Sequence, residues 1–322
     1  MMRFLSDSAI ERLREAADFP DLTGTRYELI DKLGQGGMGG VFRVQDTALD
    51  RQVAMKVMSL VDSDGTWSAR LLREARIIAK LEHPGIVPVH DSGLLPDGRP
   101  YYIMKLVQGK RLEEHVSNVA ALSDRLRIFL RICDAVAFAH ARGVLHRDLK
   151  PGNVMVGPFG EVLVMDWGLS KVVAEKTENS VSQPSELSPA NPRDRTTAHG
   201  TVLGTPGFMA PEQTRGDSVD QRADVYSLGA ILQFLSVDSS SVPRALTAVR
   251  KQAMAEDSSH RYQTVLNLAT DVAHFLDGLP VSVYPEGPLI RAGRWIVRNR
   301  VWILLLLAYV IARALLIFFR PR

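Results

Sequence analysis

A glycine-rich stretch near the start of the chain could hold phosphate groups. In KLGQGGMGGVF, residues Gly34, Gly36, Gly39 and Val41 follow the pattern G-x-G-x-x-G-x-V. Because glycine has no Cβ, the backbone N–H groups of such a loop can close over phosphate oxygens. The loop lies between two strand-like runs, RYELIDKL and VFRVQD. We therefore expect a hairpin that covers phosphates, although the glycine pattern alone is weak support for a nucleotide site.

A lysine and a glutamate further along indicate which kind of phosphate site this is. A dinucleotide-binding loop would open a helix, whereas here a strand follows and the run VAMK brings Lys56. Glu74 falls in WSARLLREARIIAKL, which has the period of a helix. Its carboxylate could hold Lys56 extended toward phosphate oxygens. The alternative for Glu74, taken in isolation, is an exposed helical side chain.

The stretch VLHRDLKPGNVMV carries a second set of reactive side chains. Asp148 comes two residues after a histidine, and Lys150 and Asn153 follow Asp148 by two and five residues. This is the arrangement of the protein-kinase catalytic loop. From about Tyr27 to Leu276 the chain therefore resembles the protein-kinase family, in particular bacterial membrane-anchored serine/threonine kinases. The resemblance also rests on MDWG, GTPGFMAPE, RADVYSLG and SSHRY.

The resemblance accounts for an acid at the end of an apolar run. In VLVMDWGLSK a strand-like stretch ends on Asp166, which occupies the metal-binding position of the family. The family implies ATP as cofactor, together with Mg²⁺, or Mn²⁺ in its place, held by Asp166 and Asn153. Trp167 stands where the family more usually has phenylalanine. We expect its ring to fill an apolar slot near Ile78.

The remaining site roles follow from the resemblance residue by residue. Asp148 would accept the proton of the substrate hydroxyl, and Lys150 would offset charge on the transferring phosphoryl group. Lys56, held by Glu74, would complete the catalytic set. Apolar side chains would sandwich the adenine ring, although a plain core role demands the same residue types. The nucleotide-binding residues expected from the family are Leu33, Gly34, Gln35, Gly36, Gly37, Met38, Gly39, Gly40, Val41, Ala54, Lys56, Met104 as gatekeeper, Lys105, Val107 and Met155.

Other residues resemble structural positions of the family. Asp224 would brace the catalytic loop from below, and Glu212 with Arg261 would tie the activation segment to the large lobe. The connection between Leu235 and Val242 is shorter than the family usually has, so its effect on substrate docking stays open.

Arg147, which precedes the catalytic Asp148, resembles the arginine that contacts a phosphate on the activation segment. Thr197 and Thr201 are the candidate sites for such a phosphate, and Thr205 looks like the threonine of the serine/threonine class. A phosphothreonine would bring close to two negative charges to Arg147. The alternative is that these threonines are solvated loop residues.

These side chains need two lobes to position them. The chain has short strand-like runs after Tyr27 and is mostly helical beyond Leu122. We expect an α+β, bilobal protein-kinase fold with a small β-rich N-lobe, a larger helical C-lobe and one C-terminal transmembrane helix. The expected boundaries are an N-terminal extension at 1–26 with a short amphipathic helix, a kinase domain at 27–276 (N-lobe 27–104, C-lobe 108–276, activation segment 166–212), a basic linker at 277–300, a transmembrane helix at 301–319 and a tail at 320–322.

The composition excludes several other classes of protein. The chain has 322 residues, of which 46% are hydrophobic and 23% charged, as in ordinary globular proteins. Its single cysteine, Cys133, excludes a disulfide framework. The first 285 residues contain no Lys/Arg-rich run with interleaved aromatics, so we expect no nucleic-acid partner.

Basic residues gather instead beside an apolar run near the C-terminus. The stretch RAGRWIVRNR precedes VWILLLLAYVIARALLIFF, whose nineteen residues would span roughly 28 Å as a helix, close to the thickness of a bilayer core. Arg313 would cost about 3 kcal/mol at the centre of a span, less than the apolar residues return. A hydrophobic core helix is the alternative. The flanking arginines predict a single-pass membrane protein with its kinase domain in the cytoplasm. The resemblance to bacterial kinases implies that this membrane is a bacterial inner membrane.

The sequence thus predicts an ATP-dependent serine/threonine kinase that phosphorylates protein hydroxyls and contacts a lipid bilayer through 301–319. A homodimer would allow autophosphorylation in trans. The alternative is a catalytically silent, nucleotide-binding pseudokinase scaffold, which the presence of Lys56, Asp148, Asn153 and Asp166 disfavours. The physiological substrate, the activating signal and the oligomeric state stay open.

Overall fold

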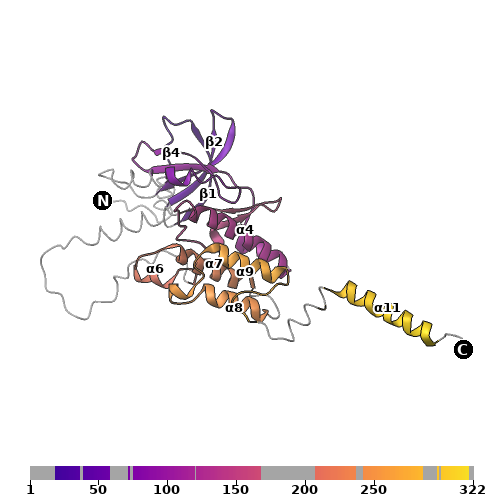
Figure 1. Ribbon diagram of the computed structural model, residues 1–322. Coiled ribbons are helices and arrows are strands. Elements are labelled where there is room, and N and C mark those ends of the chain that lie inside the picture. The colour runs from indigo at the N-terminus through magenta and orange to yellow at the C-terminus, as the bar shows by residue number, and fades with distance from the viewer. Residues whose placement is uncertain are drawn as a thin grey trace, which may run out of the picture.

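The computed structural model divides into a small lobe built on a β-sheet, a larger lobe built mainly on helices, and a separate helix near the C-terminus (Figure 1). The first two confirm the bilobal arrangement that the sequence predicts. The predicted N-terminal helix and most of the predicted activation segment lie outside the described residues. The structure describes residues 19–36, 39–58, 72, 75–119, 121–167, 207–236, 242–285, 296 and 299–318.

The small lobe is a five-stranded antiparallel sheet with the strand order β1-β2-β3-β5-β4. Burial alternates along β2, as expected for a strand that packs one face against a core. That core contains Met55 together with Phe42, Val44, Val53 and Ile103, and the last four are of types that favour strands and pack well on a pleated surface. The strands are β1 (Tyr27–Gly36), β2 (Gly39–Asp46), β3 (Arg51–Met58), β4 (Val89–Leu94) and β5 (Pro100–Lys105).

The register of these strands sets a row of side chains on the other face of the sheet. Val41 of β2 pairs with Lys56 of β3, and Lys56 pairs with Tyr102 of β5. Directly opposed residues in neighbouring strands point to the same face, so these three side chains form one row. Ala54 pairs with Met104, two residues further along each strand, and therefore shares that face.

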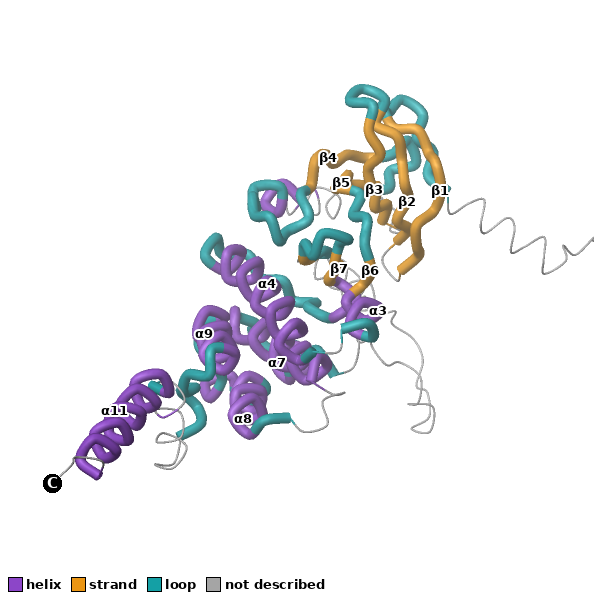
Figure 2. Tube along the Cα trace, turned by 90° about the vertical axis from the view of Figure 1, so that its right-hand side faces the viewer, coloured by secondary structure: helices purple, strands orange, loops and turns teal. Residues whose placement is uncertain are grey.

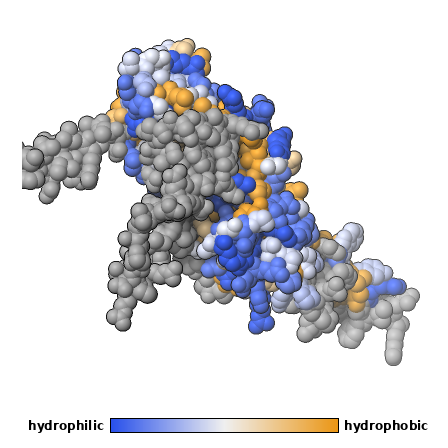
Figure 3. Space-filling model, turned by 90° about the vertical axis from the view of Figure 1, so that its left-hand side faces the viewer, coloured by the Kyte–Doolittle hydropathy of each residue, from blue (hydrophilic) through white to orange (hydrophobic). Residues whose placement is uncertain are grey.

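The large lobe packs its helices around a core of fully buried residues such as Leu126, Phe129, Val225, Leu228 and Ile231. α4 packs against α7 and α9, and α8 packs against α7 and α9. On the face drawn in Figure 3, hydrophilic residues cover most of the described large lobe. The helices are α3 (Leu112–Val116), α4 (Leu122–His140), α6 (Pro211–Arg215), α7 (Gln221–Ser236), α8 (Arg244–Ala253) and α9 (Val265–Leu276), with a short 3-10 turn at Ser258–His260.

A second, three-stranded sheet lies where the lobes meet. It has the strand order β6-β7-β8, and a 3-10 turn at Pro151–Asn153 comes directly before β7. β8 is tied to the segment before β4, because the Val164 N–H donates to the Gly85 carbonyl at 2.8 Å and the Val87 N–H donates to the Val164 carbonyl at 3.1 Å. The strand end that carries Asp166 is therefore anchored to both lobes. The strands are β6 (Lys110–Arg111), β7 (Val154–Val156) and β8 (Val162–Val164).

The C-terminal helix α11 (Arg300–Phe318) lies beyond the large lobe, far from the small one (Figures 1 and 2). It overlaps the predicted span at 301–319. In the part of the chain that the structure describes, no helix has both the length and the apolar character needed to cross a membrane. The predicted transmembrane helix is therefore not confirmed.

Candidate active site

A cavity of about 530 Å³ is formed by residues of both lobes. Most of the residues predicted to hold a nucleotide, a metal or the reacting groups line it together. Leu106, Arg111 and Met165 also line it and were missed from the sequence, although each is close in the chain to a predicted residue. The lining residues are Leu33, Gly34, Gln35, Gly39, Val41, Ala54, Lys56, Met104, Lys105, Leu106, Val107, Arg111, Asp148, Lys150, Asn153, Met155, Met165 and Asp166.

The glycine-rich stretch covers the end of β1 and the start of β2, at one edge of the cavity. Gly37 and Met38 lie outside the described residues, and Gly40 is buried in β2 without lining the cavity. At Gly39 the backbone φ is +147°, and a Cβ there would lie 1.9 Å from the Val57 carbonyl oxygen. Close approach of β2 to β3 therefore already requires glycine at this position, in addition to any role with phosphates.

The apolar end of the cavity is suited to a flat ring. Ala54 and Met104 are buried on β3 and β5, and Val41 is half-buried on β2. The backbone N–H of Lys105 donates to the Pro88 carbonyl at 3.1 Å. Lys105 can therefore offer an adenine edge only its carbonyl oxygen, which sharpens the prediction that both Lys105 and Val107 contact the base.

Lys56 and Asp166 form an ion pair at the polar end of the cavity. The Lys56 Nζ lies 2.5 Å from Asp166 Oδ1, and the two side chains are 11% and 32% exposed. Burial alone would raise the pKa of the Asp166 carboxyl, but the Lys56 ammonium outweighs it and lowers that pKa. Glu74, the predicted partner of Lys56, lies outside the described residues, so that contact stays a prediction.

Asp166 itself has a backbone φ of +57°, in the left-handed region that few non-glycine residues adopt. Aspartate tolerates this region better than most residues, because its short polar side chain can hydrogen-bond locally. With this backbone conformation, the carboxylate of Asp166 contacts the ammonium of Lys56. Strain of this kind is common where a side chain must be aimed at a ligand.

The catalytic-loop residues are held by contacts with one another. The Lys150 Nζ lies 2.9 Å from Asp148 Oδ2. The Asn153 amide nitrogen donates to the Asp148 carbonyl at 2.7 Å and to Asp148 Oδ2 at 3.0 Å. Both amide hydrogens of Asn153 are thus used, which leaves its Oδ1 oxygen to accept or to bind a cation.

Asp224 of α7 fixes the backbone of this loop from below, as predicted. Its Oδ2 accepts from the His146 N–H at 2.8 Å, and its Oδ1 accepts from the Arg147 N–H at 2.8 Å. The His140 ring nitrogen Nε2 lies 2.7 Å from Oδ2. Burial would raise the pKa of Asp224, but these hydrogen bonds lower it, so the carboxylate stays ionised.

His146 connects the loop of Asp148 with the strand end of Asp166. Its Nε2 lies 2.9 Å from the Met165 carbonyl oxygen, and its ring centroid lies 4.7 Å from that of Trp167. Burial lowers the pKa of His146, so the imidazole is neutral at neutral pH and can donate to that carbonyl. Trp167 is buried in the same cluster as Ile78, as predicted, and its indole N–H donates to the Val164 carbonyl at 3.1 Å.

Arg147 is placed beside this loop with a positive φ of +66°. Its carbonyl accepts from Gln213 Nε2 of α6 at 2.8 Å. Its Nε is buried and has no hydrogen-bond partner among the described residues. The candidate phosphate sites Thr197 and Thr201, like Thr205, lie outside those residues, so the predicted contact is not tested.

The predicted pair of Glu212 and Arg261 is present. Arg261 Nη1 donates to Glu212 Oε1 at 2.6 Å, and Nη2 donates to Oε2 at 2.8 Å. The two-point geometry matches the planar guanidinium to the carboxylate. α6 is thereby tied to the turn that precedes α9.

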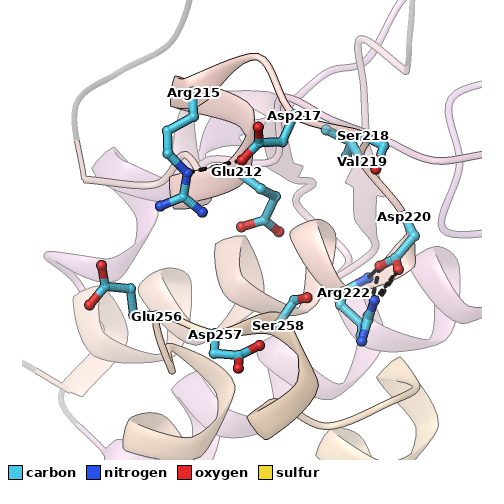
Figure 4. Close-up of a pocket in the computed structure, with 10 residues that line it drawn as sticks. All are labelled: Glu212, Arg215, Asp217, Ser218, Val219, Asp220, Arg222, Glu256, Asp257 and Ser258. Carbon is cyan, nitrogen blue, oxygen red and sulfur yellow. Dashed lines mark hydrogen bonds and ion pairs between the residues drawn. The ribbon is translucent and has the colours of Figure 1, made fainter.

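A second cavity, of about 620 Å³, lies beside this pair in the large lobe (Figure 4). Arg215 and Arg222 on its wall are each paired with an aspartate. The carboxylates outnumber the guanidinium groups, so this cavity disfavours a polyanion such as a nucleotide. Its lining residues are Glu212, Arg215, Asp217, Ser218, Val219, Asp220, Arg222, Glu256, Asp257 and Ser258.

Comparison with known proteins identifies the family. The family model described as "Protein kinase domain" matches residues 27–279. The chain belongs to the protein kinase family. It is 32% identical over 296 residues to serine/threonine-protein kinase PknD of Protochlamydia amoebophila, and the matched region covers 78% of this chain and 30% of that protein. It is 33% identical over 304 residues to PknB of Mycobacterium tuberculosis, and the matched region covers 84% of this chain and 45% of that protein.

The kinase fold also matches solved structures. The crystal structure of the PknI kinase domain of Mycobacterium tuberculosis superimposes with a TM-score of 0.58 at 26% identity, over 79% of this chain and 96% of that one. The chain spans less than half of the length of the PknD and PknB proteins that it matches. The likeness to all three is therefore a likeness of kinase domains.

Proposed function

We propose that this kinase transfers the γ-phosphoryl group of ATP to serine and threonine hydroxyls of proteins. The observation that carries the proposal is that Lys56, Asp148, Lys150, Asn153 and Asp166 line one cavity. The curated relatives are named as serine/threonine-protein kinases, which supports the same activity.

The residues divide the work of phosphoryl transfer between them. Asp148 orients the attacking hydroxyl and accepts its proton, and Lys150, 2.9 Å from Asp148, offsets negative charge on the transferring group. Lys56 contacts the phosphate oxygens of the bound nucleotide. Because phosphoryl transfer needs little covalent chemistry from the protein, this positioning and charge stabilisation account for most of the catalysis.

The donor set at the cavity fits a divalent cation. Asp166 offers a carboxylate oxygen and Asn153 an amide oxygen, both hard ligands of the kind that Mg²⁺ prefers, with Mn²⁺ as an alternative. When bound, the metal neutralises charge on the phosphates. Asp166 and Asn153 would hold it against the nucleotide while the apolar residues around Ala54 and Met104 hold the adenine ring.

The decisive test is transfer of labelled phosphate from ATP to the protein itself or to a basic protein substrate. Asp148→Asn should lower the rate by about 10²–10⁴-fold, because it removes the general base. Asp217→Asn, on the rim of the second cavity, is the matched control and should keep wild-type activity. A wild-type chain that binds nucleotide but transfers no phosphate would instead support the alternative, a catalytically silent scaffold.

The Nε of Arg147, which is buried and has no hydrogen-bond partner among the described residues, supports control by phosphorylation of the activation segment. We place the phosphate on Thr201 or Thr197, added by a second copy of the chain. It would supply Arg147 with charge-assisted hydrogen bonds. Replacing both threonines by alanine should lower activity, and Arg147→Ala should lower it equally with no additive effect. Mass spectrometry that finds the segment unmodified in a fully active enzyme would refute this control.

The C-terminal helix supports attachment to a membrane at the cytoplasmic face. Large apolar side chains of α11, such as Trp302, Leu304 and Tyr309, are more than half exposed. Arginines at 291, 294 and 298 precede the helix and Arg300 is its first residue, where anionic lipids would attract them. A chain that ends at Glu286 should keep kinase activity and lose binding to anionic vesicles. Retained vesicle binding by that truncated chain would refute attachment through α11.

A further inference from the structure

Tyr102 makes a contact with Asp166 that none of the sequence motifs includes. Its hydroxyl lies 3.3 Å from Asp166 Oδ1, and its side chain lies in the buried core at 2% exposure. It pairs directly with Lys56 across β3 and β5, and the Lys56 Nζ lies 6.0 Å from the centre of its ring. Tyr102, Lys56 and Asp166 therefore form one connected group at the polar end of the cavity.

Both protein donors in this group go to the same carboxylate oxygen. Lys56 Nζ lies 2.5 Å from Oδ1, and the Tyr102 hydroxyl donates to Oδ1 as well. Among the described residues, no donor reaches Asp166 Oδ2. A carboxylate held at one oxygen by two donors has little freedom to rotate, so its second oxygen is directed away from both of them.

We propose that Tyr102 is a positioning residue, whose hydroxyl fixes Oδ1 of Asp166 so that Oδ2 is presented to the divalent metal that accompanies ATP. This inference rests on the proposed kinase function. Lys56 also has to contact the phosphates of ATP, and that task draws its ammonium away from Asp166. The phenol has no phosphate to contact, so its hydrogen bond to Oδ1 is kept when the nucleotide is bound. A hydrogen bond from a neighbouring side chain to a metal ligand commonly sets metal affinity.

The neighbouring tyrosine shows that the hydroxyl of Tyr102 is not explained by packing alone. Tyr101 is also buried, at 7% exposure, but it belongs to the core on the opposite face of the sheet. Its ring packs edge-on against Tyr27 at 6.3 Å, and its hydroxyl has no hydrogen-bond partner among the described residues. Tyr101→Phe is therefore a matched control that removes the same atom from the same strand.

The experiment measures binding rather than catalysis. Calorimetry gives the dissociation constant of a non-hydrolysable ATP analogue, once with excess Mg²⁺ and once with EDTA, for the wild-type chain, Tyr102→Phe and Tyr101→Phe. The ratio of the two constants reports how far the metal tightens binding. Tyr102→Phe should reduce this tightening by roughly tenfold, as expected for loss of a hydrogen bond to a charged group. Its affinity in EDTA and its melting temperature should match those of Tyr101→Phe.

The outcomes separate this inference from the proposed function. Suppose that the wild-type chain transfers phosphate and that Mg²⁺ tightens binding equally in Tyr102→Phe and Tyr101→Phe. This result would overturn the role of Tyr102 and leave the proposed kinase function standing. An equal loss of affinity with and without Mg²⁺ would also overturn it, because it would show a general packing defect. A double variant with Asp166→Asn adds a further check. Tyr102→Phe should have no effect in that background if the hydroxyl acts through Asp166.

Discussion

Two ion pairs of the molecule, one between the lobes and one within the large lobe, are built differently. Lys56 and Asp166 meet through one nitrogen and one oxygen, and 32% of the Asp166 side chain is exposed to the cavity. Arg261 and Glu212 meet through two nitrogens and two oxygens, and the Arg261 side chain is 0% exposed. Arg261 also donates to the carbonyls of Ala255, Arg222 and Glu256.

This difference separates a contact that can be exchanged from one that is permanent. The ammonium of lysine is a point charge on a flexible stem, so Lys56 can exchange Asp166 for a phosphate. The guanidinium of Arg261 satisfies five acceptors at once, and no other partner could replace them all. The first pair is suited to ligand exchange and the second to holding α6 in place.

The largest expected effect is on stability and comes from Arg261→Met. This change leaves the Glu212 carboxylate and several carbonyls without donors, and should cost about 3–5 kcal/mol of unfolding free energy. Urea denaturation measures the loss. Arg215→Met is the control, because Arg215 pairs with Asp217 at the surface, where such a pair is worth less than about 1 kcal/mol. Equal losses in the two variants would remove the distinction between the permanent pair and a surface one.

Lys56→Met should have the opposite signature, a large effect on activity and a small one on stability. Phosphate transfer should fall by about 10²–10³-fold, because an electrostatic contact to the transferring phosphates is lost. The unfolding free energy should change by less than about 1 kcal/mol, since Asp166 can be hydrated from the cavity. Lys110→Met, an exposed change on β6, serves as control in both measurements. A destabilisation as large as that of Arg261→Met would contradict the exchangeable nature of this pair.

The smallest expected effect is on the pH dependence of stability. Burial would raise the pKa of Glu212, but its hydrogen bonds with Arg261 lower it below the ordinary value of 4.5. The stability that this pair contributes is therefore complete above about pH 4.5 and is lost as the pH falls through the pKa of the folded state. Between pH 6 and pH 3 the wild-type chain should lose more unfolding free energy than Arg261→Met. Urea denaturation at each pH measures these losses. Equal losses in the two proteins would show that the ionisation of Glu212 does not contribute to stability through Arg261.

The motif residues could be predicted because their spacing along the chain is itself the signature. Asp148, Lys150 and Asn153 lie within one loop, so their mutual contacts follow from a short segment. The pair of Glu212 and Arg261 is 49 positions apart in sequence, and only the family resemblance brought the two together. The lobes, the brace at Asp224 and the burial of Trp167 were predicted in the same way.

The rest depends on how distant segments meet, which spacing does not show. In the run PYYIMK, strand alternation puts Tyr102 on the face of the predicted gatekeeper Met104, but nothing in the sequence tells that its hydroxyl reaches Asp166, because that depends on how β3, β5 and the end of β8 come together. Arg111 lines the cavity only because β6 pairs with β7. The left-handed backbone conformation at Arg147 and Asp166 could not be predicted from the sequence either, because neither residue type favours this conformation as glycine does.

The brace at Asp224 divides the reacting groups between two regions with separate opening equilibria. The amides of His146 and Arg147 are bonded to a carboxylate on the buried helix α7, so the loop that carries Asp148 should open only when that helix does. Lys56 instead depends on the five-stranded sheet of the small lobe. Amide hydrogen exchange should therefore show slow exchange at His146 and Arg147 even under conditions in which the amides of β3 exchange freely. A chain whose small lobe has opened would keep the loop of its general base intact, ready for the sheet to close again.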